Sequence, residues 1–351
     1  MTDPIPIFDG HNDALLRLHR DGLEGAEQRF LKGEPRGHLD LPRASAGGFA
    51  GGLFAFYVPS RSGLDFKALS GEGYAIPLPP GVSETDARTT VVEKASIVLR
   101  MERLSGGAVS ICRTTEEVRA AMARGSLAVV MHLEGAEAID PGLRTLDVLH
   151  AVGLRSLGPV WSRDNIFGGG VPMRFPSSPD IGPGLTELGF ELVRACNRLR
   201  ILVDLSHLTD KGFWDVARTT DAPLVATHSN VHAISPSSRN LTDRQLDAIR
   251  ESDGMVGVNF ATSFLRPDGQ MRADTDLDIV IRHFDVLIER IGETRVGFGS
   301  DYDGAVVPSA IRSSADLQRL VTAMRARGYD EPLLRKLGHE NWLRVLERTI
   351  G

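Results

Sequence analysis

The segment FDGHNDALL, residues 8–16, places a histidine and an aspartate two positions apart at the end of a short apolar run. A stretch with helical character begins directly after them. Because a β-strand points residues i and i+2 to the same face, His11 and Asp13 are expected to face one target. The segment therefore predicts a buried strand that carries polar, function-bearing side chains at its carboxyl end.

A short apolar run followed by a segment of helical periodicity recurs along the chain. Apolar residues three and four positions apart indicate helices between several of the runs, as at 145–153, 185–200 and 275–292. The runs typical of β-strands number eight and lie at residues 5–10, 52–58, 127–133, 154–160, 201–206, 223–228, 255–260 and 296–300. Eight strand-then-helix units predict an α/β protein whose strands close into a (β/α)₈ TIM barrel.

The length of the chain, 351 residues, suits one large barrel. Barrels of this type commonly reach about 250 residues or more, so we expect a single barrel domain over residues 1–351. Two stretches, at about 59–90 and 162–185, are rich in Gly, Pro and Ser and too long for simple connectors. Both would leave the carboxyl ends of strands, so we expect lids or pocket walls there. For the first stretch, a surface excursion that covers a helix is an equal alternative.

The composition is that of an ordinary globular protein, with 42% hydrophobic and 25% charged residues. The formal net charge of −6 gives no field that would gather nucleic acid or anionic lipid, so a small-molecule partner is expected. Nowhere do about 18 apolar residues run together, and the start MTDPIPIF lacks the basic residues and apolar core of a signal peptide. These features predict a cytoplasmic protein with no membrane partner.

Six histidine and acidic side chains follow predicted strands at the same end of the barrel. They are His11 and Asp13 after the first strand, Glu134 after the third, His207 after the fifth, His228 at the end of the sixth and Asp301 at the end of the eighth. Any one of them alone has an ordinary structural explanation, such as a helix cap. Together in one barrel mouth they would repel or lack partners unless a positive charge lay between them. A divalent metal centre is therefore expected.

The ligand types narrow the choice of metal. Three histidines and three carboxylates without a thiolate suit zinc, with manganese or cobalt as substitutes, whereas calcium and magnesium prefer oxygen alone. Six groups exceed the needs of one tetrahedral ion, so two ions sharing a bridging carboxylate fit better, while a single-ion site stays open. Two cations would make a bridging hydroxide that attacks a polarised carbonyl, and Asp301 is the expected carrier of its proton to the leaving amine.

Several motifs occur in an order that is itself informative. They are DGHND at 9–13, EG at 134–135, GLTxxG at 184–189 leading through NRL to DLSH at 204–207, THSN at 227–230, SRN at 238–240 and GSDYDG at 299–304. In this order, over almost the whole chain, they resemble the renal (membrane) dipeptidase family of zinc metallopeptidases. The resemblance implies a metal-dependent, amidohydrolase-like barrel that hydrolyses dipeptides, including those with a C-terminal D-residue, and that assembles as a homodimer.

The resemblance also implies roles for the individual residues of the site. His11 and Asp13 would bind one of two zinc ions, His207 and His228 the other, and Glu134 would bridge them. Asp301 would hold the attacking water and move its proton. Arg239, in the SRN motif, would pair with the free C-terminal carboxylate of the substrate, since a guanidinium reads a carboxylate in a two-pronged geometry and leaves no room beyond it.

The segment PVWSRDN, residues 159–165, departs from the family pattern. Many members place a substrate-contacting histidine after the fourth strand, and Trp161 takes that place here. An indole can line a pocket and donate one hydrogen bond, but it carries no charge. Trp161 is therefore expected to bind substrate and to alter substrate preference or turnover, with Arg163 or Asn165 as candidates to replace the missing histidine.

Two further polar residues near the expected site receive structural interpretations. His132 shares a strand face with Glu134 and is expected one layer deeper, packed inside the barrel. Asp303 is expected to orient the loop around Asp301 rather than to bind metal.

Two other functions compete with a zinc dipeptidase. The first is a related binuclear-metal amidohydrolase that acts on a cyclic amide, lactone or phosphoester, or on another small amide or an N-acyl amino acid. Such barrels often bridge their metals with a modified lysine, yet no lysine ends any predicted strand and Glu134 stands at the strand end instead. The second is a barrel that has lost its chemistry and serves as a binding protein, which would be expected to lack at least one of the six groups.

Overall fold

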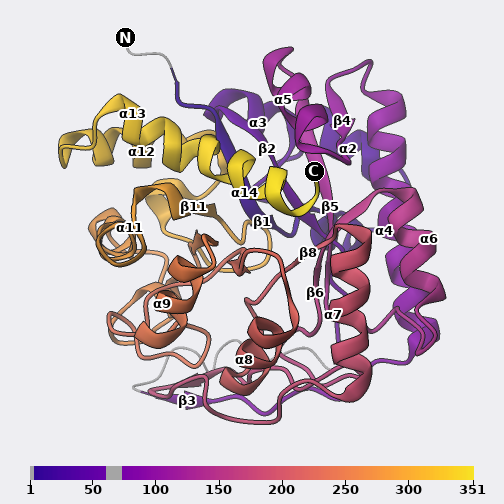
Figure 1. Cartoon of the computed structure of the whole chain (residues 1–351). Coiled ribbons are helices and arrows are strands. Elements are labelled where there is room, and N and C mark those ends of the chain that lie inside the picture. The colour runs from indigo at the N-terminus through magenta and orange to yellow at the C-terminus, as the bar shows by residue number, and fades with distance from the viewer. Residues whose placement is uncertain (1–3, 61–72) are drawn as a thin grey trace.

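The computed structural model describes residues 4–60 and 73–351, and its centre is a nearly closed barrel of eight parallel strands (Figure 1). The strands are β1 Ile7–Asn12, β2 Phe49–Ala55, β5 Leu127–Glu134, β6 Leu154–Gly158, β8 Leu202–Val203, β9 Val225–Ala226, β10 Met255–Asn259 and β11 Val296–Gly299. Their order in the sheet is β8-β6-β5-β2-β1-β11-β10-β9. A parallel bridge between Asp204 and Val225 joins β8 to β9 and completes the ring.

Each of the eight predicted strands is present, so the TIM-barrel prediction is confirmed. The boundaries differ, because β2 begins three residues earlier than expected and β8 and β9 keep only two residues each in regular pairing. The sequence prediction missed β4 (Val109–Ile111), which pairs with the first part of β5. A strand of three residues is too short to show periodicity.

The helices surround the barrel, with α4, α6 and α7 along one side and α9 and α11 along the other (Figure 1). They are α1 Ala14–Arg20, α2 Ala26–Lys32, α3 Leu41–Gly47, α4 Glu84–Leu104, α5 Thr115–Ala123, α6 Arg144–Val152, α7 Glu187–Leu199, α8 Asp210–Thr219, α9 Asp243–Glu251, α10 Thr262–Leu265, α11 Leu277–Ile291, α12 Leu317–Ala326, α13 Glu331–Arg335 and α14 Asn341–Thr349. The helices expected within 145–153, 185–200 and 275–292 are thus α6, α7 and α11. Within the described ranges, none of the helices combines the length and apolar character needed to cross a membrane.

The two long irregular stretches meet each other at the carboxyl side of the barrel. The short strand β3 (Tyr74–Ala75) of the first pairs antiparallel with β7 (Arg174–Phe175) of the second. The first stretch ends earlier than predicted, because residues 84–90 form the start of α4, where the Ser83 hydroxyl accepts a hydrogen bond from the Asp86 amide at 3.1 Å. Residues 61–72 of that stretch lie outside the described residues.

The barrel is filled at its other end by Trp342 of α14. Its indole Nε1 donates to the carbonyl oxygen of Phe298 at 2.9 Å, and its ring lies against Gly10 and Gly297. A Cβ atom at Gly10 would come within 2.4 Å of this ring, so the glycine is needed for the close approach. The interior is therefore solid at the amino ends of the strands, which leaves the carboxyl ends for a site.

Replacing Trp342 by alanine should lower the free energy of unfolding by about 3–5 kcal/mol, because the change opens a cavity and leaves a carbonyl without its donor. Urea denaturation of the metal-free protein measures the change. Val148→Ala, at an exposed position on α6, is the matched control and should stay within about 0.5 kcal/mol of the parent. A loss of under about 1 kcal/mol in Trp342→Ala would contradict the assigned role.

Candidate metal centre

The structure brings all five predicted metal-binding side chains together at the carboxyl ends of the strands. His11 and Asp13 come from the end of β1 and the residue after it, and Glu134 ends β5. His207 and His228 follow the short strands β8 and β9. Each of the five is buried, with His11 fully so. Parallel strands deliver them to one place because their carboxyl ends share one rim of the barrel.

Glu134 lies between two sets of ligand-type side chains. Its Oε2 atom is 3.6 Å from His11 Nε2, which is in turn 3.5 Å from Asp13 Oδ2. Its Oε1 atom is 3.0 Å from His207 Nε2 and 3.6 Å from His228 Nε2. One carboxylate thus presents a different oxygen to each set.

His11 supplies the test of whether a cation fits. Neither of its ring nitrogens has a hydrogen-bond partner among the described residues, although the side chain is 0% exposed. A buried polar group without a partner costs about 1–3 kcal/mol. A divalent cation between His11, Asp13 and Glu134 would satisfy the Nε2 atom, and the mixed nitrogen and oxygen donors suit such an ion. The residues therefore fit a metal centre.

Burial and charge set the protonation states of the three histidines. Burial lowers the pKa of His207 and of His228 well below its usual value, with Arg239 and His11 acting in the same direction. These two rings are therefore neutral near pH 7 and keep a lone pair, as metal ligands must. Burial also lowers the pKa of His11, but Glu134 and neighbouring carboxylates outweigh it and raise that pKa to about 10. The carboxylates around His11 therefore strongly favour a positive charge at this position.

Asp301 projects toward the same place from the loop after β11. Its backbone has φ +58° and donates from the amide to the carbonyl oxygen of His11 at 3.0 Å. Its Oδ2 atom accepts from Asn259 Nδ2 at 2.9 Å. Burial raises the pKa of this carboxyl, although His11 opposes the change. The side chain is consequently held firmly and takes up a proton more readily than an exposed aspartate.

Asp303 holds the loop around Asp301, as the sequence predicts. Its carboxylate accepts from the backbone amide of His38 at 2.7 Å and forms an ion pair with Arg17 Nε at 3.2 Å. It thereby ties the loop after β11 to the segment between α2 and α3.

A cavity of about 320 Å³ opens above the centre. Its acidic and imidazole side chains are Asp13, Glu134, His207, Asp301 and Asp303, and its apolar side chains include Leu16, Tyr57, Trp161, Met173, Phe264 and Met271. Asp13, Glu134 and His207 belong to the metal centre, and the apolar side chains belong to a hydrophobic cluster separate from the barrel core. A small molecule in this cavity would therefore meet charge on one side and an apolar wall on the other.

The two predicted substrate-binding residues take different positions around this cavity. Trp161 lines it, with its ring centroid 4.8 Å from that of Tyr57 and 5.7 Å from that of His207. Arg239 is buried beside it, with Nη2 3.4 Å from His207 Nε2 and the guanidinium 5.4 Å from the Phe264 ring centroid. Both are next to the metal centre.

The expectation that Arg163 or Asn165 replaces the missing histidine is wrong. Arg163 is fully buried and binds Glu137 through Nε at 3.0 Å, and Asn165 donates to the carbonyl oxygen of Pro159. Neither residue lines the cavity. Their polar groups are used to hold the loop that carries Trp161.

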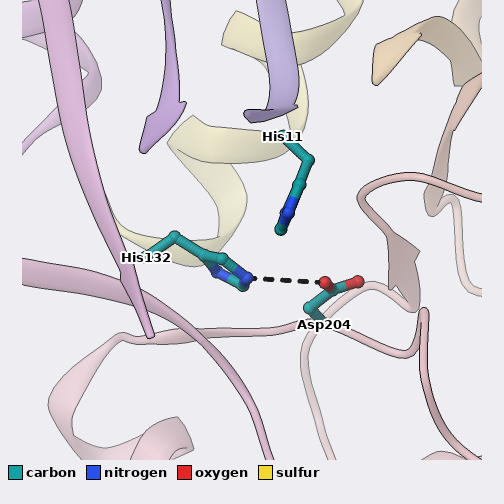
Figure 2. A group of neighbouring side chains, drawn as sticks. All are labelled: His11, His132 and Asp204. Carbon is teal, nitrogen blue, oxygen red and sulfur yellow. Dashed lines mark ion pairs between the residues drawn. The ribbon is translucent and has the colours of Figure 1, made fainter. Parts of the chain in front are cut away.

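Sequence reasoning missed a second layer of polar side chains beneath the centre. Asp204 is buried there, 3.7 Å from His132 Nε2 (Figure 2). His132 packs edge-on against His11 with ring centroids 5.3 Å apart, so its predicted interior position is confirmed. The DLSH motif could have indicated this layer, because Asp204 and Ser206 are two positions apart, as His11 and Asp13 are.

The family model for membrane dipeptidases, Peptidase family M19, matches residues 1–350. The chain belongs to the membrane dipeptidase family. As a member of this family, the protein is a metallo-dipeptidase, and the resemblance seen in its motifs is confirmed.

Similar structures and sequences agree with this family. A metallopeptidase from Rhodobacter sphaeroides, crystallised with a phosphinate mimic of the dipeptide L-Ala-D-Ala, is 56% identical with a TM-score of 0.97, over 99% of this chain and 100% of that one. An uncharacterized protein of the pqqA 5′ region in Klebsiella pneumoniae is 46% identical over 257 residues, which are 73% of this chain and 95% of the relative. The probable dipeptidase PvdM from Pseudomonas aeruginosa, 21% identical with a TM-score of 0.83 over 99% of this chain and 96% of that one, shares the fold.

Glu134→Gln should weaken the binding of divalent cations more than about tenfold, because one oxygen of the carboxylate is replaced and the negative charge between the two sets is lost. Metal content per chain after dialysis, measured by mass spectrometry, tests this. Glu251→Gln, at an exposed position on α9, is the control and should retain the metal content of the parent. Equal metal content in Glu134→Gln and the parent would contradict the position assigned to Glu134.

Proposed function

We propose that this metallo-dipeptidase holds two zinc ions on either side of Glu134 and hydrolyses small dipeptides, including those with a C-terminal D-residue. The observation that carries the proposal is the position of the Glu134 carboxylate, whose two oxygens face different histidines. Its Oε2 atom faces His11, and its Oε1 atom faces His207 and His228. His11 and Asp13 would hold one ion, and His207 and His228 the other. Manganese or cobalt would be substitutes with the same donor preferences.

When bound, two zinc ions supply an acidified water as nucleophile and polarise the substrate carbonyl. The chain must then move protons and orient the dipeptide. Asp301 is the proposed proton carrier, because it lines the cavity, it is fixed by Asn259, and burial raises its pKa toward the range in which a carboxyl both accepts and returns a proton. It would take the proton of the water and deliver it to the leaving amine.

Arg239 is the proposed partner of the C-terminal carboxylate of the substrate. Its guanidinium is buried next to His207, and its Nε atom has no hydrogen-bond partner among the described residues. A carboxylate paired with this buried cation would gain a strong charge-assisted contact. Since the contact needs a free C-terminal carboxylate close to the cleaved bond, it would favour dipeptides over longer peptides.

The apolar wall supports a preference for dipeptides with small or apolar side chains. Trp161, Tyr57 and Phe264 offer ring faces, and Met173 adds an adaptable side chain. The relative from Rhodobacter sphaeroides was crystallised with a mimic of L-Ala-D-Ala, which has two methyl side chains and a D-residue at its C-terminus. L-Ala-D-Ala is therefore the first substrate to test.

Two expectations from the sequence accompany this proposal. A cytoplasmic location and a homodimer without nucleic-acid or membrane partners stay predictions, and sedimentation of the zinc-loaded protein would measure its assembly.

Zinc-loaded protein should hydrolyse L-Ala-D-Ala, and C-terminal amidation of the dipeptide should lower kcat/KM about 10- to 100-fold through loss of the charged contact with Arg239. In Arg239→Met, the free dipeptide should lose a similar factor, whereas the amide should lose little more. Steady-state kinetics with both substrates gives this comparison. Equal effects of the substitution on both substrates would contradict the pairing, and no hydrolysis of any L-L or L-D dipeptide by protein with two zinc ions would contradict the substrate class.

Asp301→Asn should lower kcat about 10²- to 10⁴-fold, because the amide cannot carry the proton. The expected zinc content stays at two ions per chain, since the proposed ligands are other residues. Kinetics together with metal analysis separates the two effects. A variant that keeps both its kcat and its zinc would rule out Asp301 as the proton carrier.

A further inference from the structure

Asp204 is a buried carboxylate beneath the metal centre that no step of the proposed reaction uses. Its Oδ1 atom accepts from the backbone amide of Ser206 at 3.1 Å, the hydroxyl of Ser206 at 2.6 Å and the backbone amide of Thr227 at 2.8 Å. Its Oδ2 atom accepts from the Thr227 hydroxyl at 2.6 Å. Asp204 thus links the ends of β8 and β9, the two strands that His207 and His228 follow.

These contacts determine the direction of one hydrogen bond. A carboxylate only accepts, so the single proton of the Thr227 hydroxyl is donated to Asp204. Thr227 Oγ1 also lies 2.8 Å from His228 Nδ1. With its own proton already used, this oxygen can only accept there, and His228 Nδ1 must carry a hydrogen. The lone pair of the ring is then at Nε2, the atom that faces Glu134 at 3.6 Å.

We propose that Asp204 is a positioning residue that acts through Thr227 to hold His228 in the tautomer required of a metal ligand. Carboxylates that orient a ligating histidine in this way are a common feature of metal sites and raise the basicity of the ligand. Here a threonine hydroxyl stands between the carboxylate and the ring. The inference rests on the proposed two-ion centre, but it concerns the strength of metal binding rather than the identity of the substrate.

The second histidine of the same set offers a contrast. His207 Nδ1 lies 3.0 Å from the Ser162 hydroxyl. Within the described part of the chain, this hydroxyl has no further hydrogen-bond partner, so it can donate or accept. The contact with Ser162 therefore does not set the tautomer of His207, whose Nε2 atom instead lies 3.4 Å from the donor Nη2 of Arg239. The contact of Thr227, by contrast, determines the tautomer of His228. The effect of Asp204 should therefore appear at His228.

Two nearly isosteric substitutions change the hydrogen bonds that run from Asp204 through Thr227 to His228, each in a different way. Thr227→Val removes the acceptor from His228 Nδ1. In Asp204→Asn, the three donors at Oδ1 would keep the amide oxygen in place, and the amide nitrogen would point at Thr227. The Thr227 hydroxyl would then accept from that nitrogen and donate to His228 Nδ1. His228 would carry its hydrogen on Nε2, where it blocks metal binding.

The test is zinc affinity, measured by competition with a chromophoric chelator at fixed pH. Thr227→Val should lower the affinity for one of the two zinc ions about 10- to 100-fold. Asp204→Asn should lower the affinity for the same ion at least as much. Thr227→Ser keeps the hydroxyl and should stay within about threefold of the parent. Thr115→Val, at a buried threonine of α5 whose hydroxyl has no partner among the described residues, is the matched control and should leave both affinities unchanged.

Unchanged affinities in both Thr227→Val and Asp204→Asn would overturn the inference, as would a loss of the same size in Thr115→Val. A parent protein that fails to bind two zinc ions would instead refute the proposed function. A measurement on the parent needs no variant to fold: ¹⁵N-histidine NMR of the zinc-loaded protein should show His228 protonated at Nδ1. An unprotonated Nδ1 would overturn the inference.

Discussion

The structure depends on one electrostatic constraint, which is the burial of histidine and carboxylate side chains around Glu134 at the mouth of the barrel. Without cations, burial raises the pKa of the Glu134 carboxyl well above its usual value, and His11 has no hydrogen-bond partner for either ring nitrogen in the described structure. Two divalent cations would reverse both penalties, because each ion would satisfy one histidine set and neutralise part of the carboxylate charge. Stability and catalysis would then both depend on the binding of these ions.

In the barrel, the tightly packed apolar side chains and the polar side chains of the site lie at opposite ends of the axis. At the amino ends of the strands, Trp342 packs on glycines so closely that a single added Cβ would collide with its ring. At the carboxyl ends, the same strands deliver polar groups to one rim. Between the two lies the buried layer of Asp204 and His132, which supports the centre from below (Figure 2). The rigid base allows the ligands to be held before any metal arrives.

Periodicity and residue spacing were enough to predict the barrel and the group of residues at its mouth. The spacing of two positions predicts that His11 and Asp13 share a target, and the predicted strand end gives the position of Glu134. Contacts between distant segments could not be predicted in this way. The pairing of β3 with β7, the role of Arg163 in holding the loop of Trp161, and the two hydrogen bonds from Thr227 to Asp204 each depend on partners that only the folded chain brings together.

Anomalous diffraction from crystals of the zinc-loaded protein, measured at the zinc absorption edge, would show whether two ions share Glu134. Two peaks per chain, about 3.5–4 Å apart, are expected. One should lie by His11 and Asp13, the other by His207 and His228, with a Glu134 oxygen bound to each. A single peak, or a second peak away from Glu134, would contradict the sharing of Glu134.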